Sequence, residues 1–264
     1  MTEQDCIGAH LMRIYLCKVS LRAVSVQNKH AGFEFMSNTL TLLHTSPIHI
    51  ATFDRLLMAL APDVPVRHIV REALLSDARA NGLSPGLMAR IGDEVRAAAS
   101  GTSVVLCTCS TIGACAEQAG ACADGVPVLR VDRPMAARAV SLGGTVVIAA
   151  ALASALAPAR ALVMGEAGRA GKPIAIVEVL CDGAWALFEA GDDAGYIAAL
   201  LPHVRRAATL GDVVVLAQAS MSAAVDVLGA TAVPVLSSPR LGLEAAVATY
   251  RVCETSGVNS NSSS

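Results

Sequence analysis

Charged and aromatic side chains are scarce in this sequence. Charged residues make up 16% of the 264 residues and aromatic residues 3%, whereas hydrophobic residues make up 54%. Twenty basic against 22 acidic side chains leave a net charge of −2, and no basic block stands out, so the electrostatic attraction that holds nucleic acids is missing. We therefore expect no nucleic-acid partner. The apolar composition also excludes a disordered chain.

Long apolar runs are missing as well. The uncharged stretch Ser141 to Ala159 contains two glycines and Pro158 and is barely long enough to cross a bilayer. A buried strand over Thr145 to Ala150, followed by a loop and a helix, explains it better. Scattered charges near the amino terminus interrupt any secretory signal. We therefore expect no membrane association and a cytoplasmic location.

Patterns that bind metals or cofactors are absent too. The eight cysteines, at positions 6, 17, 107, 109, 115, 122, 181 and 253, have irregular spacing and include no paired Cys-x-x-Cys knuckles. They are typical of reduced intracellular thiols. Neither a phosphate-binding P-loop nor a dinucleotide fingerprint occurs. The sequence thus predicts no metal and no cofactor.

Short β-rich runs alternate with longer segments of helical period, which indicates parallel strands joined by helices. The fold class predicted is α/β, with two pseudo-symmetric lobes, each a small parallel sheet flanked by helices. The predicted strands are Thr39–His44, Pro65–Val70, Ser103–Cys107, Pro127–Val131, Thr145–Ala150, Pro173–Val179, Asp212–Leu216 and Pro234–Ser237.

Domain limits follow from the same alternation. Residues 1–36 contain no clear signals for the start or end of a helix or strand and are expected to form a poorly ordered extension. Residues 37–133 together with 236–252 are expected to form the first lobe, and residues 134–235 the second. Residues 253–264 are rich in Ser and Asn and are expected to be a disordered tail.

An internal repeat supports the two lobes. The run Val104–Ser110 aligns with Val214–Ser220, and this alignment pairs Cys109 with Ala219. Ligands in parallel α/β sheets bind beyond the carboxyl ends of the strands. We therefore expect the active site in the cleft between the lobes, between Cys109 and Ala219.

Cys109 is the candidate catalytic residue, because it stands where a strand ends and a helix begins. The first free amides of a helix favour negative charge and lower the pKa of a thiol, and Ser110 and Thr111 add hydroxyl groups there. A buried structural cysteine is the alternative for this position. Cys107, two residues earlier, is expected to lie in the core.

The loop after the first strand, His44 to His49, belongs beside Cys109 if the sheet is doubly wound. Thr45 and Ser46 are candidates to bind a substrate carboxylate. His44 and His49 are auxiliary candidates for acid, base or orienting roles, with ordinary structural positions as their alternative. Three charged residues after the fourth strand are expected to form a solvated rim or ion pairs between the lobes: Arg130, Asp132 and Arg133.

With these residues in place, the sequence resembles the aspartate/glutamate/hydantoin racemase superfamily over roughly residues 39–250. Cys109-Ser110-Thr111 matches the Cys-Asn-Thr motif of that group's first lobe. Gln218-Ala219-Ser220 stands where the second lobe usually has Gly-Cys-Thr, so the second cysteine is missing. The resemblance implies two α/β lobes, cofactor-independent chemistry and a carboxylate site at Thr45 and Ser46.

The function predicted from this combination is thiol-mediated proton transfer at a carbon next to a carboxylate of a small substrate. Racemisation, isomerisation and bond cleavage all stay open, and so does a homo-oligomeric assembly. The alternatives are a one-thiol decarboxylase or lyase of the same superfamily, a carboxylate-binding protein without catalysis, and a redox thiol protein. The residues expected to bind the substrate are Thr45, Ser46, Ser110, Thr111, Gln218 and Ser220.

Overall fold

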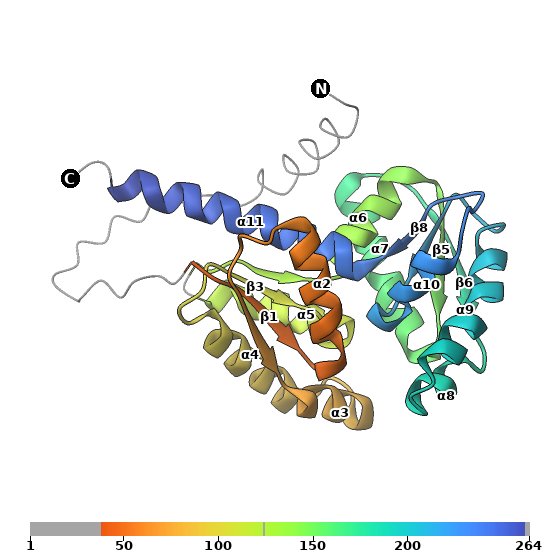
Figure 1. Cartoon of the computed structure of the whole chain (residues 1–264), viewed down its shortest axis with the longest axis horizontal. Helices are drawn as coiled ribbons and strands as arrows, with labels where there is room; N and C mark the ends of the chain where they lie inside the picture. Colours follow the sequence, from red (N-terminus) through yellow and green to blue (C-terminus); the bar gives the residue numbers. More distant parts are fainter. Residues whose placement is uncertain (1–37, 124, 262–264) are drawn as a thin grey trace. The chain divides into compact units, whose positions relative to one another are not determined.

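The structure, a computed structural model, describes residues 38–123 and 125–261, whose strands form two parallel four-stranded sheets. The first sheet has the order β2-β1-β3-β4 and the second β6-β5-β7-β8 (Figure 1). This confirms the predicted α/β class with two similar sheets. The strands are β1 (Leu40–His44), β2 (Val66–Val70), β3 (Val104–Cys107), β4 (Val128–Arg130), β5 (Thr145–Ala150), β6 (Ala175–Leu180), β7 (Val213–Leu216) and β8 (Val235–Ser237).

The strands form where the sequence predicts them, each within two residues of the expected limits. The central strands are buried on both faces, so they are almost wholly apolar: β3 reads VVLC and β7 reads VVVL, and all eight side chains are buried. In each sheet the first strand pairs with the third, β1 with β3 and β5 with β7. The loops that leave these two strands therefore emerge side by side.

Helices cover both faces of the first sheet. α2 (Ile50–Leu60) and α11 (Ser238–Asn261) pack Phe53 and Leu243 against Leu40 and Leu42 on one face. The other face is covered by α3 (Glu72–Asn81), α4 (Pro85–Ala99) and α5 (Ser110–Ala119). Figure 1 shows α2 and α4 on opposite sides of β1.

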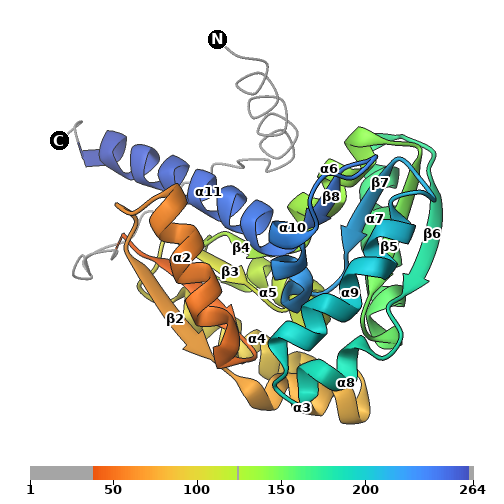
Figure 2. The same cartoon turned by 45° about the vertical axis from the view of Figure 1, so that its right-hand side comes forward.

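The second sheet is covered in the same way. α6 (Arg133–Leu142) and α7 (Leu156–Ala170) pack on one face, and α8 (Ala184–Glu189), α9 (Asp193–Ala207) and α10 (Ala223–Val227) pack on the other (Figure 2). Short 3-10 helices complete the connections: η1 (Pro47–His49), η2 (Gly120–Cys122), η3 (Ala153–Ala155) and η4 (Ala219–Ser222).

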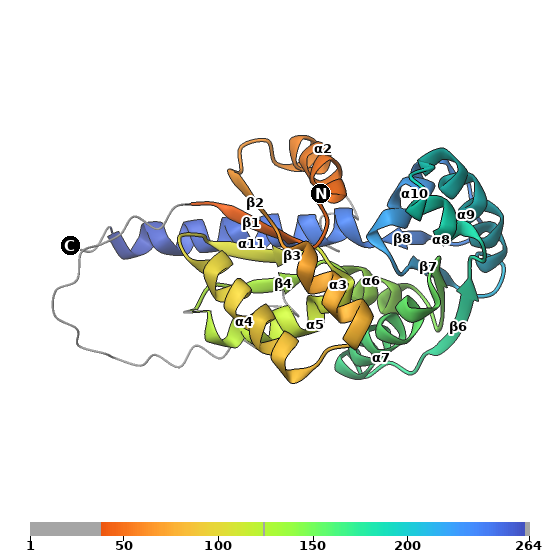
Figure 3. The ribbon, with the colours of Figure 1, turned by 90° about the horizontal axis from the view of Figure 1, so that it is seen from below.

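The chain returns to the first sheet through α11, which runs along that sheet in Figure 3. The expected boundary before residue 236 falls inside β8, which pairs with β7, so the return begins at Ser238. A close backbone approach fixes α11, because a Cβ on Gly242 would lie 2.5 Å from the carbonyl oxygen of Val131. Only glycine fits there without displacing the helix.

The carboxyl-terminal tail expected from residue 253 differs from the structure, in which α11 continues to Asn261. Cys253 packs against the core of the first sheet, and the hydroxyl of Tyr250 donates a hydrogen bond of 2.9 Å to Glu254. These contacts hold α11 against the first sheet at Cys253 and link its turns as far as Glu254. Residues 1–36, expected to be an extension, and residues 262–264 lie outside the described residues.

The helical periods of the sequence predict helices at residues 50–60, 86–99, 112–123, 134–142, 194–208, 222–228 and 241–250 and after the strand at 145–150, but not α3 or α8. α3 buries only Leu74 and Ala78, and α8 has six residues, so neither has a strong apolar period. In the part of the chain that the structure describes, no helix combines the length and the apolar character needed to cross a membrane.

Candidate active site

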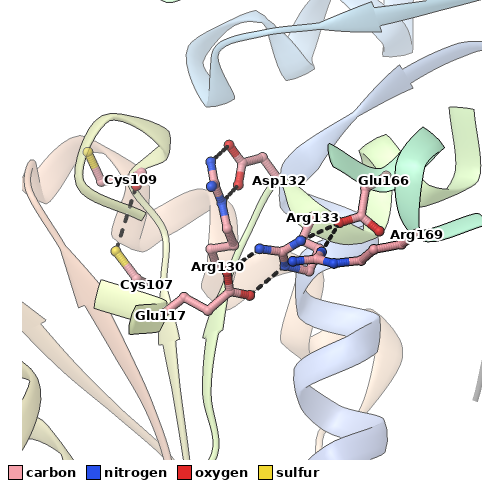
Figure 4. A network of polar contacts seen from close by, with 8 residues as sticks. All are labelled: Cys107, Cys109, Glu117, Arg130, Asp132, Arg133, Glu166 and Arg169. Atoms are coloured by element: carbon pink, nitrogen blue, oxygen red, sulfur yellow. Dashed lines mark hydrogen bonds and ion pairs between the residues drawn. The ribbon is translucent and has the colours of Figure 1, made fainter. Parts of the chain in front are cut away.

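Cys109 occupies the corner between β3 and α5. It is the N-cap residue of α5, with φ −107° and ψ 116°, and its side chain makes no capping hydrogen bond. The side chain is half-buried and packs against the cluster that includes Leu43 and Ile112. Figure 4 shows its sulfur on the side away from Arg130. The thiol therefore lies at the start of a ten-residue helix, at the edge of an apolar core.

Cys107 lies deeper, as the sequence predicts. It is fully buried, and its thiol donates to the carbonyl oxygen of Cys109 at 3.7 Å. Burial, with the neighbouring Cys109 sulfur as a further cause, raises the pKa of the Cys107 thiol. Cys107 therefore stays protonated at neutral pH and is unsuited to act as a base or nucleophile.

Ser110 and Thr111 form the first turn of α5 and line a cavity of about 280 Å³. Arginine side chains from β4 and from the helices of the second sheet line the same cavity. No acidic residue is among the described residues that line it. The wall is therefore rich in hydrogen-bond donors, from Ser110, Thr111, Arg130, Arg133 and Arg169.

Carboxylates balance the charge of these arginines: Figure 4 shows Asp132 paired with Arg130, and Glu117 and Glu166 paired with Arg133. Arg130 makes a two-pronged ion pair with Asp132, at 2.6 and 2.8 Å, and both side chains are more than nine-tenths buried. The pair was expected on a solvated rim or between the lobes; instead it is buried at the end of β4. α5 packs closely on this pair, because a Cβ on its Gly113 would lie 3.2 Å from the Cβ of Arg130.

Arg133 connects the helices of the two sheets. Its guanidinium pairs with Glu117 on α5, which covers the first sheet, and with Glu166 on α7, which covers the second. Arg169 also binds Glu166. Burial, assisted by Glu117, raises the pKa of Glu166, while Arg133 opposes that shift. The ion pair between the two halves of the fold, expected from the sequence, is therefore made by Arg133.

The loop after β1 lies beside the loop that contains Cys109. The amide of Thr108 donates to the carbonyl oxygen of Leu43 at 3.0 Å, which brings the two strand ends together. Thr45 is buried, and Ser46 is half-buried in an extended conformation before η1. These two candidates therefore lie at the same edge of the sheet as Cys109.

His44 is part of the core. Its ring is fully buried, with Nδ1 2.8 Å from the hydroxyl oxygen of Thr108 and Nε2 2.9 Å from Nδ1 of His68. Nε2 of His68 lies in turn 3.0 Å from Asp54. When both rings are neutral, Thr108 donates to His44, His44 donates to His68, and His68 donates to Asp54. Both ring nitrogens of His44 are thus occupied by protein partners.

Burial lowers the pKa of His44 to about 3, with His68 and His49 as smaller causes. A ring with this pKa is neutral at physiological pH and has no proton to give to a substrate. It lines neither of the two cavities described for this chain. The buried, neutral ring of His44 is therefore unsuited to the auxiliary acid-base role expected from the sequence. His49, which directly precedes α2, is half-buried, and burial lowers its pKa as well.

The second sheet repeats the first, but in a register one residue away from the sequence alignment. The amide of Thr108 donates to Leu43, and the amide of Ala217 donates to Ala149 in the same way. A second pair of bonds agrees: Val105 to Pro127 in the first sheet and Val214 to Pro234 in the second. Thr108 therefore corresponds to Ala217.

Cys109 consequently corresponds to Gln218, and its expected pairing with Ala219 is corrected. Gln218 is the residue directly before η4, just as Cys109 directly precedes α5, and its backbone angles, φ −122° and ψ 138°, are similar. The misalignment has a simple cause. Val213–Leu216 contains three valines in succession, so an alignment by residue type can slip by one position without penalty.

Gln218 and Ser220, both expected to bind substrate, have partners inside the fold. The side-chain oxygen of Gln218 accepts hydrogen bonds from the amides of Ala151, at 2.8 Å, and Leu152, at 3.0 Å. The Ser220 hydroxyl lies 3.0 Å from that of Tyr196, whose pKa is raised to about 12 by burial. Gln218 therefore closes the loop after β5.

A second cavity, of about 340 Å³, lies at Ser220 and Ala219. Residues of α2, including Thr52 and Arg55, form the opposite wall. The candidates thus fall into three groups: Ser110 and Thr111 at one cavity, Ser220 at the other, and Cys109, Thr45 and Ser46 at the edge of the first sheet. No sequence motif marks Arg169, Glu166 or Tyr196, because each gains its role only through contacts between distant elements.

Comparison with known proteins gives evidence at the level of structure alone. No family model and no curated protein sequence matches the chain. An aspartate racemase from Picrophilus torridus is similar in structure, with a TM-score of 0.59 and 14% identity over 82% of this chain and 94% of that one. A glutamate racemase from Bacillus anthracis gives 0.57 and 14% over 83% of each chain.

Arylmalonate decarboxylase, in its unliganded form, is also similar, with a TM-score of 0.50 and 17% identity over 80% of this chain and 92% of that one. At these identities the likeness concerns the fold. The resemblance drawn from the Cys109 motif is confirmed at the level of the fold, which this chain shares with these two racemases and with arylmalonate decarboxylase.

Proposed function

We propose that this chain is an enzyme of the racemase type that uses the Cys109 thiol to transfer a proton at a carbon next to a carboxylate. The observation that carries the proposal is the position of Cys109, directly before α5 and at the carboxyl edge of the first sheet. The fold shared with racemases and a decarboxylase supports it. No cofactor takes part in the proposed reaction.

The site supplies three elements that such a reaction needs. The amino end of α5 stabilises negative charge, whether on the Cys109 sulfur or on a bound carboxylate. The hydroxyls of Ser110 and Thr111 add donors in the first turn. The raised pKa of Cys107 leaves Cys109 as the thiol of this strand end that can exchange a proton.

A one-sided reaction is favoured over racemisation by two bases. Racemisation requires an acid and a base on opposite faces of the reacting carbon. The position equivalent to Cys109 holds Gln218, a carboxamide that neither gives nor takes a proton near neutral pH. The second candidate function is therefore a decarboxylase or lyase that protonates its product from one face.

The chemical balance of a one-sided decarboxylation is simple. The bond between the reacting carbon and one carboxylate breaks, carbon dioxide leaves, and the electron pair stays on the carbon as an enediolate conjugated with the remaining carboxylate. The Cys109 thiol then donates its proton to that carbon, and the thiolate takes a proton from water. Neither a redox partner nor a leaving group other than carbon dioxide is required.

The experiment is a panel of amino acids, hydantoins, malonates and 2-substituted succinates incubated with the protein in deuterium oxide. Deuterium at the carbon next to the carboxylate is followed by proton NMR, and the configuration by chiral chromatography. Cys109→Ser is compared with Cys115→Ala, which removes a half-buried thiol of the same helix. We expect deuterium on one face, lost in Cys109→Ser and kept in Cys115→Ala.

Two results would refute the proposal. Full turnover by Cys109→Ser would mean that another group moves the proton. Tight binding of a panel member without exchange or turnover, unaffected by Cys109→Ser, would identify a carboxylate-binding protein without catalysis. Rapid racemisation of aspartate or glutamate by the native protein would retain Cys109 but exclude the one-sided form of the reaction.

A further inference from the structure

The side chain of Gln218 binds to the backbone of the loop after β5. Its amide oxygen accepts both backbone N–H groups that follow β5, those of Ala151 and Leu152, at 2.8 and 3.0 Å. Two adjacent amides that converge on one oxygen are an arrangement that proteins use to hold an oxyanion or a carboxylate. In the loop after β5, the side chain of Gln218 supplies that oxygen.

The corresponding place in the first sheet lacks such an oxygen. The amide of Arg71 donates to His44, and the amide of Cys181 donates to Ala150 in the same way, so the residues after His44 correspond to those after Ala150. Thr45 and Ser46 therefore hold the positions of Ala151 and Leu152. Among the described residues, no side-chain oxygen accepts from either of these two amides.

The residue across from these amides explains the difference. Cys109 holds the position of Gln218, but a cysteine side chain ends two atoms earlier along the chain and carries no carbonyl oxygen. Cys109 therefore leaves unfilled the place that the Gln218 oxygen takes in the second sheet. The backbone hydrogen bonds around Cys109 and around Gln218 are equivalent, so the difference between the two positions lies in the side chain.

We propose that Gln218 is a specificity-determining residue that blocks the second of two equivalent carboxylate seats. The first seat, formed by the amides of Thr45 and Ser46, binds one carboxylate of the substrate beside Cys109. The second seat, formed by the amides of Ala151 and Leu152, is occupied by Gln218. The two halves of a symmetric fold thus bind one substrate in one orientation.

The relative strength of carboxylates and carboxamides as hydrogen-bond acceptors favours an open first seat and a second seat filled by Gln218. A carboxylate is a stronger acceptor than a carboxamide because its bonds to N–H groups are charge-assisted. Without Gln218, the second pair of amides would attract the same anions as the first, and a carboxylate substrate would have two competing positions. The neutral side-chain oxygen of Gln218 satisfies the two donors and adds no negative charge at the second seat.

The carboxylate seat at Thr45 and Ser46 rests on the proposed function, whereas the role of Gln218 can be tested without any turnover. Acetate is titrated into the native full-length protein, labelled with ¹⁵N and deuterium, and the amide resonances are followed. We expect saturable shifts at Thr45 and Ser46 and none at Ala151 and Leu152. In Gln218→Ala we expect new saturable shifts at Ala151 and Leu152.

Two variants serve as controls. Gln218→Met removes the oxygen but keeps the length of the side chain, so acetate is not expected to enter the second seat. Gln118→Ala removes an exposed glutamine of α5 and should behave like the native protein. If Gln218→Ala fails to fold, the native titration still decides, because equal shifts at both pairs of amides would overturn the proposal.

The outcomes separate this inference from the proposed function. Absence of new shifts in a folded Gln218→Ala protein would overturn the blocking role of Gln218, and absence of shifts at Thr45 and Ser46 would overturn the first seat. Acetate binding as expected, together with no deuterium exchange on any panel substrate, would leave the role of Gln218 standing and count against the reaction alone.

Discussion

Acid should destabilise this protein through His44, and His44→Asn should remove that part of its pH dependence. The His44 ring is fully buried between β1 and α2, and burial lowers its pKa from 6.5 to about 3. In the unfolded chain the same ring takes up a proton near pH 6.5. Between the two values the unfolded state binds one proton more than the folded state.

The sign and size follow from this proton. A depressed pKa in the folded state means that stability is fully present above pH 6.5 and falls as the pH drops toward 3. Each pH unit within that window costs about 1.4 kcal/mol, so His44 alone lowers the free energy of unfolding by about 2 kcal/mol at pH 5. Over the whole window the loss is about 5 kcal/mol, which is comparable to the total stability of many domains.

The measurement is urea unfolding by circular dichroism at half-unit steps from pH 7.5 to 4.5. His44→Asn cannot take up the proton, so its free energy of unfolding should fall less steeply with falling pH than that of the native protein. Between pH 6 and 4.5 the two slopes should differ by about 1.4 kcal/mol per pH unit, which corresponds to one proton. At pH 7.5 the variant should be less stable by about 1–3 kcal/mol, because Thr108 and His68 lose their partner.

His203→Asn is the matched control, since His203 lies on α9 beside the other sheet and has no contact with the ring pair. His49, whose pKa is also lowered by burial, is present in both proteins and cancels in the comparison. Parallel pH profiles for His44→Asn and the native protein would refute the reasoning. They would mean that the His44 ring accepts a proton in the folded state without cost.

Three further predictions concern packing, the ion network and metals. Gly242→Ala should lower the melting temperature by about 5 °C or more, because its Cβ would lie 2.5 Å from the oxygen of Val131; Gly165→Ala, with open space around it, should not. Arg133→Met should cost about 2–4 kcal/mol in urea unfolding, since it leaves Glu166 nearly buried without its main cation, and an unchanged midpoint would contradict this. Once a turnover assay exists, activity should survive dialysis against a chelator, and recovery only on adding zinc or manganese would show that a metal takes part.

The fold was largely determined by local sequence. Every predicted strand forms, because a β-rich apolar run in a parallel sheet is buried on both faces and leaves a clear signal. The Cys109 corner was also visible, since the end of a strand and the start of a helix can be read from residue types. α3 and α8 were not, because they bury few side chains and so have little periodicity.

Other features depended on contacts between distant residues. The burial of His44 depends on Phe53, His68 and Thr108, which contact it from α2, from the middle of β2 and from the end of β3. Nothing in the sequence near residue 44 distinguishes such a ring from one that faces a substrate. Its neutral state is a consequence of tertiary burial.

The register of the repeat shows the same division most clearly. The sequence by itself determined that the chain contains two similar halves and that the first carries a cysteine which the second lacks. Only the hydrogen-bonded ladders decided that Gln218, and not Ala219, corresponds to that cysteine, because a run of valines aligns equally well in either register while backbone hydrogen bonds form in one. Side-chain identity sets what a strand can bury, and the fixed spacing of the ladder sets which residue reaches the site.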